Sequence, residues 1–305
     1  MFALNEFIKF LKKSGIAYEE NVEGKKLCSF RVGGNVRVVV KPKNADELEG
    51  LYYYFEENGI KNILLGRGSN VVISDGGYDG AVVSLCELSS VDIDITDDCC
   101  IVAGAGASLL KLANFAKDTG LSGLEFAHGI PGSVGGAVYM NAGAYGGEIS
   151  GVLKSCLVFD KTQGSFFIAD ASECDFSYRH SIFMDDKNLI VLFATFELEA
   201  GEPDKIKAKM DELKAARLSK QPLEYPSAGS TFKRPEGHFA GKLIEDAGLK
   251  GYAKGGAAVS EKHAGFIINR TDATAEDIKE LVAHVQKTVK EKFDVSLECE
   301  IEFVE

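Results

Sequence analysis

The fold of this chain is decided by a glycine-rich stretch at residues 124–147, which reads LEFAHGIPGSVGGAVYMNAGAYGG. Between Gly129 and Ala137 there are almost no bulky side chains, so the segment cannot build a hydrophobic core. Its small residues allow backbone N–H groups to approach a ligand closely, and the usual ligand of such a loop is a phosphate. A second small-residue loop, LGRGSN, occupies residues 65–70. Two such loops predict a long diphosphate cofactor that is held at more than one point.

Length and composition are those of a globular protein with more than one domain. The chain has 305 residues, 45% of them hydrophobic and 26% charged, and this length fits two or three domains. The 33 glycines beside only 6 prolines indicate tight turns and ligand loops rather than linkers. The net charge is −12 and no long basic run occurs, so neither nucleic acid nor a membrane is expected as a partner.

Seven cysteines are scattered along the sequence without the spacing of a metal site. They are typical of free thiols in a reducing compartment, so no metal is predicted and a cytoplasmic location is expected. The first residues show a helical apolar pattern rather than a signal sequence, and no apolar run in the sequence reaches the length of a membrane span.

Capping residues predict where several helices begin. Asn44 is expected as an N-cap, a helix is expected to run from Ser108 to a C-capping Gly120, and Thr274 with Asp277 forms a capping box before an apolar helical pattern. A charged amphipathic helix is predicted over residues 205–217.

Alternation of apolar and acidic residues predicts strands at 91–95 and 297–303. Because the strand period is two residues, Glu298, Glu300 and Glu302 would share one face of the second strand. Alternation does not choose among these three glutamates, and a solvated acidic face is the default interpretation.

Eight sequence blocks, in order, resemble the UDP-N-acetylenolpyruvoylglucosamine reductases, the flavoproteins of bacterial cell-wall precursor synthesis. Any one of the glycine patterns is weak evidence, but the set covers nearly the whole chain and is highly specific. The blocks are RVGG at 31–34, LGRGSNV at 65–71, the glycine-rich stretch to 147, YRHS at 178–181, AGSTFK at 228–233, GGAAV at 255–259, HAGFIIN at 263–269 and LECE at 297–300.

The resemblance implies an α+β fold. Residues 1–88 and 89–200 would form the two parts of an FAD-binding domain of the vanillyl-alcohol-oxidase type. Residues 201–305 would form a substrate domain whose last strand packs back on the FAD domain. A monomer is expected. The chain matches the shorter branch of the family, because the segment between Arg179 and Leu189 leaves no room for an inserted substrate-capping loop.

The resemblance also implies the reaction. Non-covalent FAD would be reduced by NADPH and would then reduce the enolpyruvyl ether of UDP-N-acetylglucosamine to UDP-N-acetylmuramate. The implied process is peptidoglycan synthesis, and with it cell wall biogenesis, cell shape and cell division. Hydride would pass from N5 of FAD to the vinyl CH2 carbon, charge would build on the substrate carboxylate, and a proton would reach the carbon that bears the ether oxygen.

Three residues are assigned catalytic roles by the resemblance. Ser230 would donate the proton, Arg179 would meet the carboxylate with its planar charged fork, and Glu300 would support the enol-like intermediate as an acid. From the residues alone, a turn hydroxyl, a surface ion pair and a solvated strand face are the alternative interpretations.

The cofactor contacts are expected mainly from backbone groups of the two loops, with helix N-terminal amides at the second. Tight turns in an unrelated fold are the alternative interpretation, and a classical dinucleotide fold is disfavoured because its strand–GxGxxG–helix unit does not occur. The assigned cofactor residues are Gly66, Arg67, Gly68, Ser69, Asn70, Val71, Pro131, Gly132, Ser133, Gly135, Gly136 and Asn141. Candidate substrate contacts, from their place in the motifs, are Tyr178, Lys233, His263 and Asn269.

Two other functions stay open. An FAD oxidase with the same type of flavin domain would be reoxidised quickly by air and would not need NADPH. A nucleotide-sugar-binding protein that has kept the fold without the flavin would be colourless even after FAD is added.

Overall fold

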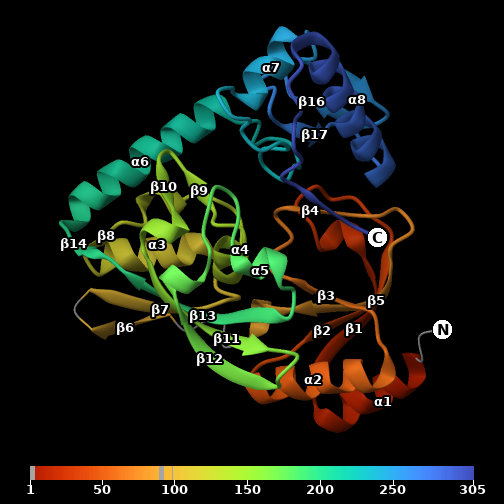
Figure 1. Cartoon of the computed structure of the whole chain (residues 1–305), viewed down its shortest axis with the longest axis vertical. Helices are drawn as coiled ribbons and strands as arrows, with labels where there is room; N and C mark the ends of the chain where they lie inside the picture. Colours follow the sequence, from red (N-terminus) through yellow and green to blue (C-terminus); the bar gives the residue numbers. More distant parts are fainter. Residues whose placement is uncertain (1–3, 89–92, 98) are drawn as a thin grey trace. The chain divides into compact units, whose positions relative to one another are not determined.

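The computed structural model describes residues 4–88, 93–97 and 99–305 (Figure 1). By its internal packing the chain divides into two compact units. The first comprises Met1–Glu19, Val38–Arg67 and Gly80–Ala216, and the second comprises Glu20–Arg37, Gly68–Asp79 and Arg217–Glu305. The three-part division at residues 88 and 200 stays a prediction.

Two helices cover a four-stranded sheet at the beginning of the chain. The core between them joins Phe7 and Leu11 of α1 (Leu4–Ser14) to Leu48 and Leu51 of α2 (Ala45–Asn58). The N-cap predicted for α2 is confirmed, because Asn44 Oδ1 accepts a hydrogen bond from Glu47 N at 2.8 Å. The strand order is β1-β2-β5-β3, with β1 (Ala17–Glu23), β2 (Asn35–Lys41), β3 (Asn62–Leu65) and β5 (Tyr78–Ser84).

A five-stranded antiparallel sheet supplies the second core of the first unit. Its order is β12-β11-β13-β7-β6, with β6 (Ile93–Asp97), β7 (Cys100–Gly104), β11 (Leu153–Asp160), β12 (Ser165–Asp170) and β13 (Leu189–Glu197). The strand predicted from residue 91 is described only from Ile93 on, since residues 91 and 92 lie outside the described ranges.

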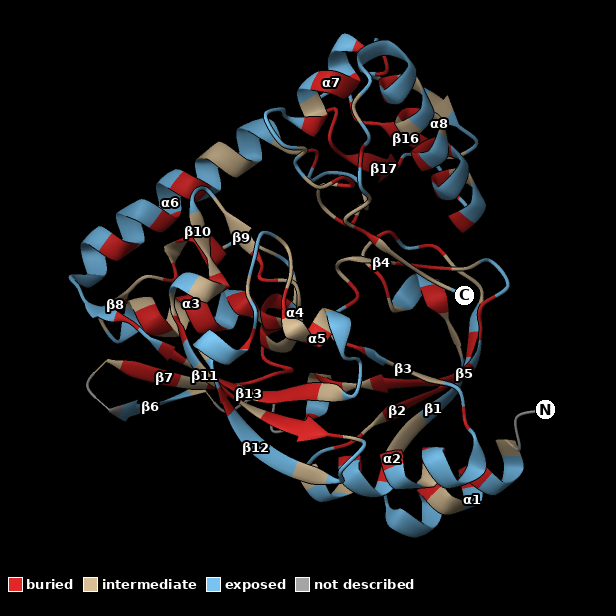
Figure 2. Ribbon diagram, in the orientation of Figure 1, coloured by how far each residue is buried: buried red, intermediate tan, exposed pale blue. Residues whose placement is uncertain are grey.

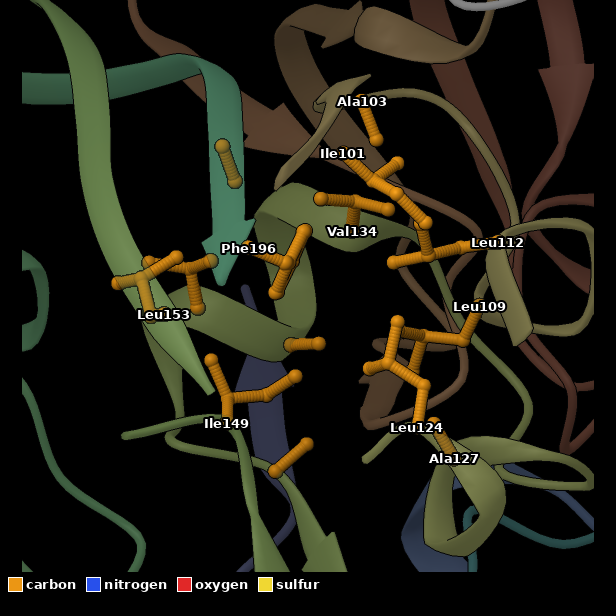
Figure 3. Packing of buried hydrophobic residues seen from close by; sticks show 14 of the residues in the cluster. Ile101, Ala103, Leu109, Leu112, Leu124, Ala127, Val134, Ile149, Leu153 and Phe196 are labelled. Carbon is orange, nitrogen blue, oxygen red and sulfur yellow. The ribbon is translucent and has the colours of Figure 1, made fainter. Parts of the chain in front are cut away.

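Helices α3 (Leu109–Asp118) and α4 (Val134–Tyr139) contribute to the core of this sheet. Figure 3 shows Val134, the first residue of α4, beside Ile101, Leu112 and Phe196 in that core. Ser108 Oγ accepts from Lys111 N at 3.2 Å and so caps α3 at the residue where the sequence places the start of this helix. The packing therefore fixes where α4 begins, and α4 follows the glycine-rich loop directly.

The charged helix predicted over residues 205–217 is confirmed as α6 (Pro203–Lys220). It buries Ile206, Met210 and Leu213 and exposes most of its other residues (Figure 2). The remaining elements of the first unit are short: η2 (Leu85–Glu87), β8 (Leu121–Ser122), η3 (Glu125–Ala127), β9 (Gly143–Ala144), β10 (Gly147–Glu148), η4 (Ile149–Gly151), η5 (Ala171–Glu173), α5 (Ile182–Asp185) and β14 (Glu199–Ala200).

The second unit is built on a long helix and a small sheet. The apolar face of α8 (Ala275–Phe293) buries Ile278, Leu281, Val285 and Val289. The capping box of Thr274 and Asp277 is confirmed by both of its hydrogen bonds. The other elements of this unit are η1 (Gly24–Lys26), β4 (Val71–Ile73), α7 (Ala240–Asp246), β15 (Ala253–Lys254), β16 (Ala257–Val259), β17 (Ile267–Asn269) and β18 (Glu302–Val304).

The predicted closing strand is much shorter than residues 297–303. Only β18 is a strand, and it pairs in parallel with β4. Before β18, Cys299 makes an isolated bridge with Phe232, and Glu300 N donates to Thr231 O at 2.8 Å. The alternation in the sequence is wrong for a continuous strand over 297–303, because the residues before β18 share hydrogen bonds with the loop at Thr231, Phe232 and Lys233.

Candidate active site

The two glycine-rich loops meet inside the first unit. A Cβ atom on Gly66 would lie 2.3 Å from Ser133 Oγ, so a side chain at position 66 would displace the Ser133 hydroxyl. Ser133 is 2% exposed and is the N-cap of α4, where its Oγ accepts from Gly136 N at 3.3 Å. The structure thus joins the two segments that the sequence assigned to one cofactor. A backbone cradle of this kind fits a diphosphate group.

The first amides of α4 are already bonded to the protein. Val134 N donates to Ala107 O, and Gly135 N donates to Ala105 O, both at 2.8 Å. A Cβ on Gly135 would lie 2.8 Å from Ala105 Cβ, so close packing alone accounts for this glycine. These amides would reach a phosphate only if α4 moved. The cofactor contacts assigned to Pro131, Gly132, Ser133, Gly135 and Gly136 stay a prediction.

The second part of the upstream loop belongs to the second unit, which begins again at Gly68. Gly68 has a φ of 63°, and a Cβ there would lie 1.8 Å from Leu27 O. Ser69 O accepts from Ser29 Oγ at 3.4 Å, and Val71 begins β4. The unit boundary lies between Arg67 and Gly68, so residues up to Arg67 belong to the first unit and residues from Gly68 on belong to the second.

Asn70 connects this loop to the predicted catalytic glutamate. Its Nδ2 donates to Glu300 O at 2.9 Å, and its own carbonyl accepts from Glu302 N at 2.9 Å. The Asn70 side chain therefore helps to hold the C-terminal segment, and the FAD contact assigned to this residue stays a prediction.

Arg179 lies on a tight turn of the first unit with a φ of 54°. Its side chain is 16% exposed, donates from Nη2 to Gly143 O at 2.8 Å, and places Nη1 3.7 Å from Glu148 Oε1. The guanidinium also lies 4.9 Å from the centre of the Tyr178 ring, which is partly exposed. A guanidinium presents its five N–H groups in a planar fork that matches a carboxylate.

His180, the residue after Arg179, is hydrogen-bonded to the carboxylate of Asp185. His180 Nε2 lies 3.1 Å from Asp185 Oδ1 at the end of α5, and this hydrogen bond raises the pKa of His180 above its ordinary value. Asp175, His180 and Asp185 are also the one group in the described ranges whose ligand atoms lie close enough to hold a metal ion. The histidine–aspartate hydrogen bond accounts for most of this proximity.

Ser230 and Glu300 are brought together by the backbone of Thr231 in the second unit. Thr231 O accepts from Glu300 N at 2.8 Å, and Thr231 N donates to Gly265 O at 2.9 Å. Ser230 Oγ donates to Phe232 O at 3.4 Å. Ser230 and Glu300 therefore lie on segments that a main-chain hydrogen bond joins, and their roles as proton donor and supporting acid stay predictions.

Lys233 pairs with Glu298 and not with Glu300, the glutamate assigned to catalysis. Lys233 Nζ lies 2.5 Å from Glu298 Oε1, and its backbone amide donates to Glu298 O at 2.9 Å. Glu298 is thereby paired, which separates it from Glu300. Between them, burial raises the pKa of the Cys299 thiol to about 11, as expected of a packing residue rather than a nucleophile.

His263 lies beside the serine loop. A Cβ on Gly265 would lie 3.0 Å from His263 Cε1 and 3.6 Å from Ser230 Oγ. Burial lowers the pKa of His263, and its Nδ1 accepts from Gly265 N at 3.1 Å. The imidazole is therefore neutral at pH 7 and carries its proton on Nε2.

Asn269 is 9% exposed and uses both ends of its amide within the protein. Nδ2 donates to Phe30 O at 3.0 Å, and Oδ1 accepts from Ala273 N at 2.9 Å. These bonds give the side chain a structural role, and the substrate contact assigned from its motif stays a prediction.

Two residues that sequence reasoning passed over matter here. Thr231 is fully buried, and its Oγ1 accepts from Ile267 N at 3.0 Å. Glu148 pairs with Arg179 and closes the glycine-rich stretch. A polar residue beside the assigned serine was a usable signal for Thr231, whereas the partner of Arg179 depends on how the chain folds back.

Comparison with known proteins agrees with these features. The family profile described as UDP-N-acetylenolpyruvoylglucosamine reductase, C-terminal domain, matches residues 221–304, and an FAD-binding-domain profile matches residues 36–161. The chain is 52% identical over 289 residues to the UDP-N-acetylenolpyruvoylglucosamine reductase of Listeria monocytogenes serotype 4a, covering 95% of each chain. It is 47% identical over 306 residues to the enzyme of that name from Clostridium perfringens strain SM101, covering 99% of each.

A solved structure extends the likeness to three dimensions. The crystal structure of UDP-N-acetylenolpyruvylglucosamine reductase from Thermus caldophilus is 33% identical in sequence and matches with a TM-score of 0.80. The match covers 95% of this chain and 99% of the other.

The predicted α+β fold with an FAD-binding domain of the vanillyl-alcohol-oxidase type is confirmed, and FAD is the cofactor. Within the described ranges, none of the helices combines the length and the apolar character needed to cross a membrane. The chain therefore belongs to the UDP-N-acetylenolpyruvoylglucosamine reductase family, the FAD-dependent oxidoreductases of peptidoglycan synthesis.

Proposed function

We propose that this protein reduces the enolpyruvyl ether of UDP-N-acetylglucosamine to UDP-N-acetylmuramate, with NADPH as the source of the electrons. Bound FAD supplies the hydride that adds to the vinyl CH2 carbon of the substrate. The observation that carries the proposal is the main-chain hydrogen bond from Glu300 N to the carbonyl of Thr231, the residue after Ser230. It joins the segments of the two residues, and a reduction of this kind needs a proton donor and a second acid.

Each chain residue has a separate task in this reaction. Arg179 binds the substrate carboxylate, where negative charge grows as hydride arrives. Ser230 gives the proton on its Oγ to the carbon that bears the ether oxygen, which completes the saturated lactyl ether. Glu300 hydrogen-bonds to the enol-like form of the carboxylate and stabilises the charge before the proton is transferred.

The neutral histidine beside the serine supports this assignment. A serine hydroxyl is a weak acid, so the oxygen that remains after proton transfer must be stabilised and reprotonated. His263 carries a proton on Nε2 and lies next to the serine loop. It adds no positive charge to the loop, because burial lowers its pKa.

The proposal is tested by following the visible absorbance of the purified protein without oxygen. NADPH should bleach the flavin, and the colour should return only after the enolpyruvyl substrate is added. Reoxidation by air alone at a comparable rate would support the oxidase, and a colourless protein that does not take up FAD would support the binding protein. Running the second step in D2O should place one deuterium on the carbon next to the carboxylate.

Two further properties belong to the test of this proposal: the protein is a monomer, and its preference between NADPH and NADH is to be measured. Size-exclusion chromatography with light scattering tests the first statement. The ratio of kcat/KM for the two nicotinamide cofactors tests the second.

A further inference from the structure

Asn141 holds together the surroundings of Arg179. It follows the last residues of α4 with a φ of 44°, a left-handed conformation that asparagine tolerates better than most residues. It is 1% exposed. A buried amide side chain must find hydrogen-bond partners, and these partners indicate what the residue does.

All the hydrogen bonds of the Asn141 side chain lead toward the arginine turn or the segment that faces it. Nδ2 donates to Ser177 O at 2.9 Å and lies 3.3 Å from Glu148 Oε2, and Oδ1 accepts from Ser150 N at 2.9 Å. Both donors and the acceptor are thus used within the protein. Because its side chain is hydrogen-bonded within the protein, the FAD contact that the sequence assigns to Asn141 would come from its backbone.

Arg179 is reached from the same residue by three routes. Its Nη1 donates to Asn141 O at 3.5 Å, and it pairs with Glu148, which also receives a hydrogen bond from the Asn141 amide. Ser177, the third contact, closes the turn, because Ser177 and His180 exchange backbone hydrogen bonds at 3.2 Å. Arg179 lies inside that turn.

We infer that Asn141 is a positioning residue for substrate reduction: it fixes the Arg179 turn and its counter-ion, so that the guanidinium meets the substrate carboxylate in one orientation. The inference rests on the proposed role of Arg179. A loosely held arginine would still attract a carboxylate, but orientation is a large part of catalysis, and a displacement of about 1 Å can cost about 100-fold in rate.

The variant Asn141→Gly removes the side chain and keeps the left-handed backbone available. Asn21→Gly is the matched control, because Asn21 is exposed and also has a positive φ of 52°. Binding is measured by calorimetry with two nucleotide sugars. UDP-N-acetylmuramate carries the carboxylate, and UDP-N-acetylglucosamine lacks it.

We expect Asn141→Gly to weaken binding of UDP-N-acetylmuramate about tenfold, by loss of orientation at the carboxylate, and to leave the affinity for UDP-N-acetylglucosamine within a factor of two of wild type. The kcat for the enolpyruvyl substrate should fall as well, whereas FAD content should match that of Asn21→Gly. Equal weakening of both sugars, or loss of FAD, would overturn the inference, because either result would mean general damage to the fold.

A parallel Arg179→Lys variant separates this inference from the proposed function. If Arg179→Lys shows the carboxylate-selective loss and Asn141→Gly does not, the positioning role is wrong and the role of Arg179 stands. If neither variant discriminates between the two sugars, the carboxylate role of Arg179 itself is wrong.

Discussion

Arg179 and Ser230 are held in place by different kinds of interaction. Side chains hold Arg179: Asn141 and Glu148 fix the turn from one side, and Asp185 holds the neighbouring histidine. Main-chain hydrogen bonds hold Ser230, through Thr231 to Gly265 and Glu300. A site held by the backbone tolerates most changes of nearby side chains, whereas a site held by side chains depends on each of them. The predictions below test this difference, beginning with the largest effect.

The most severe loss is expected from Ser230→Ala. Removing a positioned proton donor should lower kcat for the enolpyruvyl substrate by about 10²- to 10⁴-fold. Reduction of the flavin by NADPH should proceed near its normal rate, as measured by stopped-flow absorbance at saturating NADPH. Loss of both steps together would contradict the assigned role.

Thr231→Val tests how strongly the main-chain arrangement around Ser230 depends on the Thr231 hydroxyl. Valine has the shape of threonine but leaves the buried Ile267 amide without the Oγ1 acceptor, at a cost of about 1–3 kcal/mol. Thr231→Ser is the control, since it keeps the acceptor and loses one methyl group, worth about 0.8 kcal/mol. Urea unfolding at a fixed excess of FAD should find the valine variant the less stable; the opposite order would mean that the hydroxyl is dispensable.

Glu148→Gln tests the electrostatic part of the arginine surroundings. It removes a charge 3.7 Å from Arg179 and keeps the size of the side chain. Since partly exposed ion pairs contribute about 0.2–1 kcal/mol, the KM for the enolpyruvyl substrate should change by less than about tenfold. Glu197→Gln, which removes an exposed partner of Lys154 in the same unit, should leave the KM unchanged. A loss as large as that of Ser230→Ala would mean that charge rather than geometry holds the arginine.

The smallest effect is expected in the pH dependence of stability. Burial lowers the pKa of His263 below its ordinary value of 6.5, so on acidification the unfolded chain takes up this proton before the folded protein does. Stability is therefore lost as the pH falls below that ordinary value. His263→Gln should reduce the slope of unfolding free energy against pH below 6.5, measured by urea unfolding at a series of pH values. His128 has a pKa shifted in the same direction by burial, so a residual slope is expected in this variant.

Local elements were well predicted where the physical cause is local. The N-cap Asn44 and the capping box at Thr274 appear as predicted, because a cap needs only a side chain within three residues of the amide that it accepts from. The closing strand at 297–303 was overestimated for the opposite reason. Alternation reports extension, but a ladder needs a partner strand, and only β18 has one.

The glycines show the same division. The sequence predicted that both loops approach something closely, and they do. For Gly66 and Gly135, however, the near neighbours are Ser133 and Ala105 of the protein itself. A glycine indicates a position without room for a Cβ atom, and only the folded chain shows which neighbour occupies that space.

By itself, the sequence determined the family, the flavin cofactor, the α+β class and the identities of Ser230, Arg179 and Glu300 as candidates, because motif order and residue chemistry survive without coordinates. The tertiary structure alone decided which glutamate Lys233 pairs with, that Asn70 and Asn141 give their side chains to the protein, and that Ser230 and Glu300 share the Thr231 backbone. Hydrogen bonds between segments far apart in the chain depend on where the folded backbone brings them, and residue spacing carries no record of that.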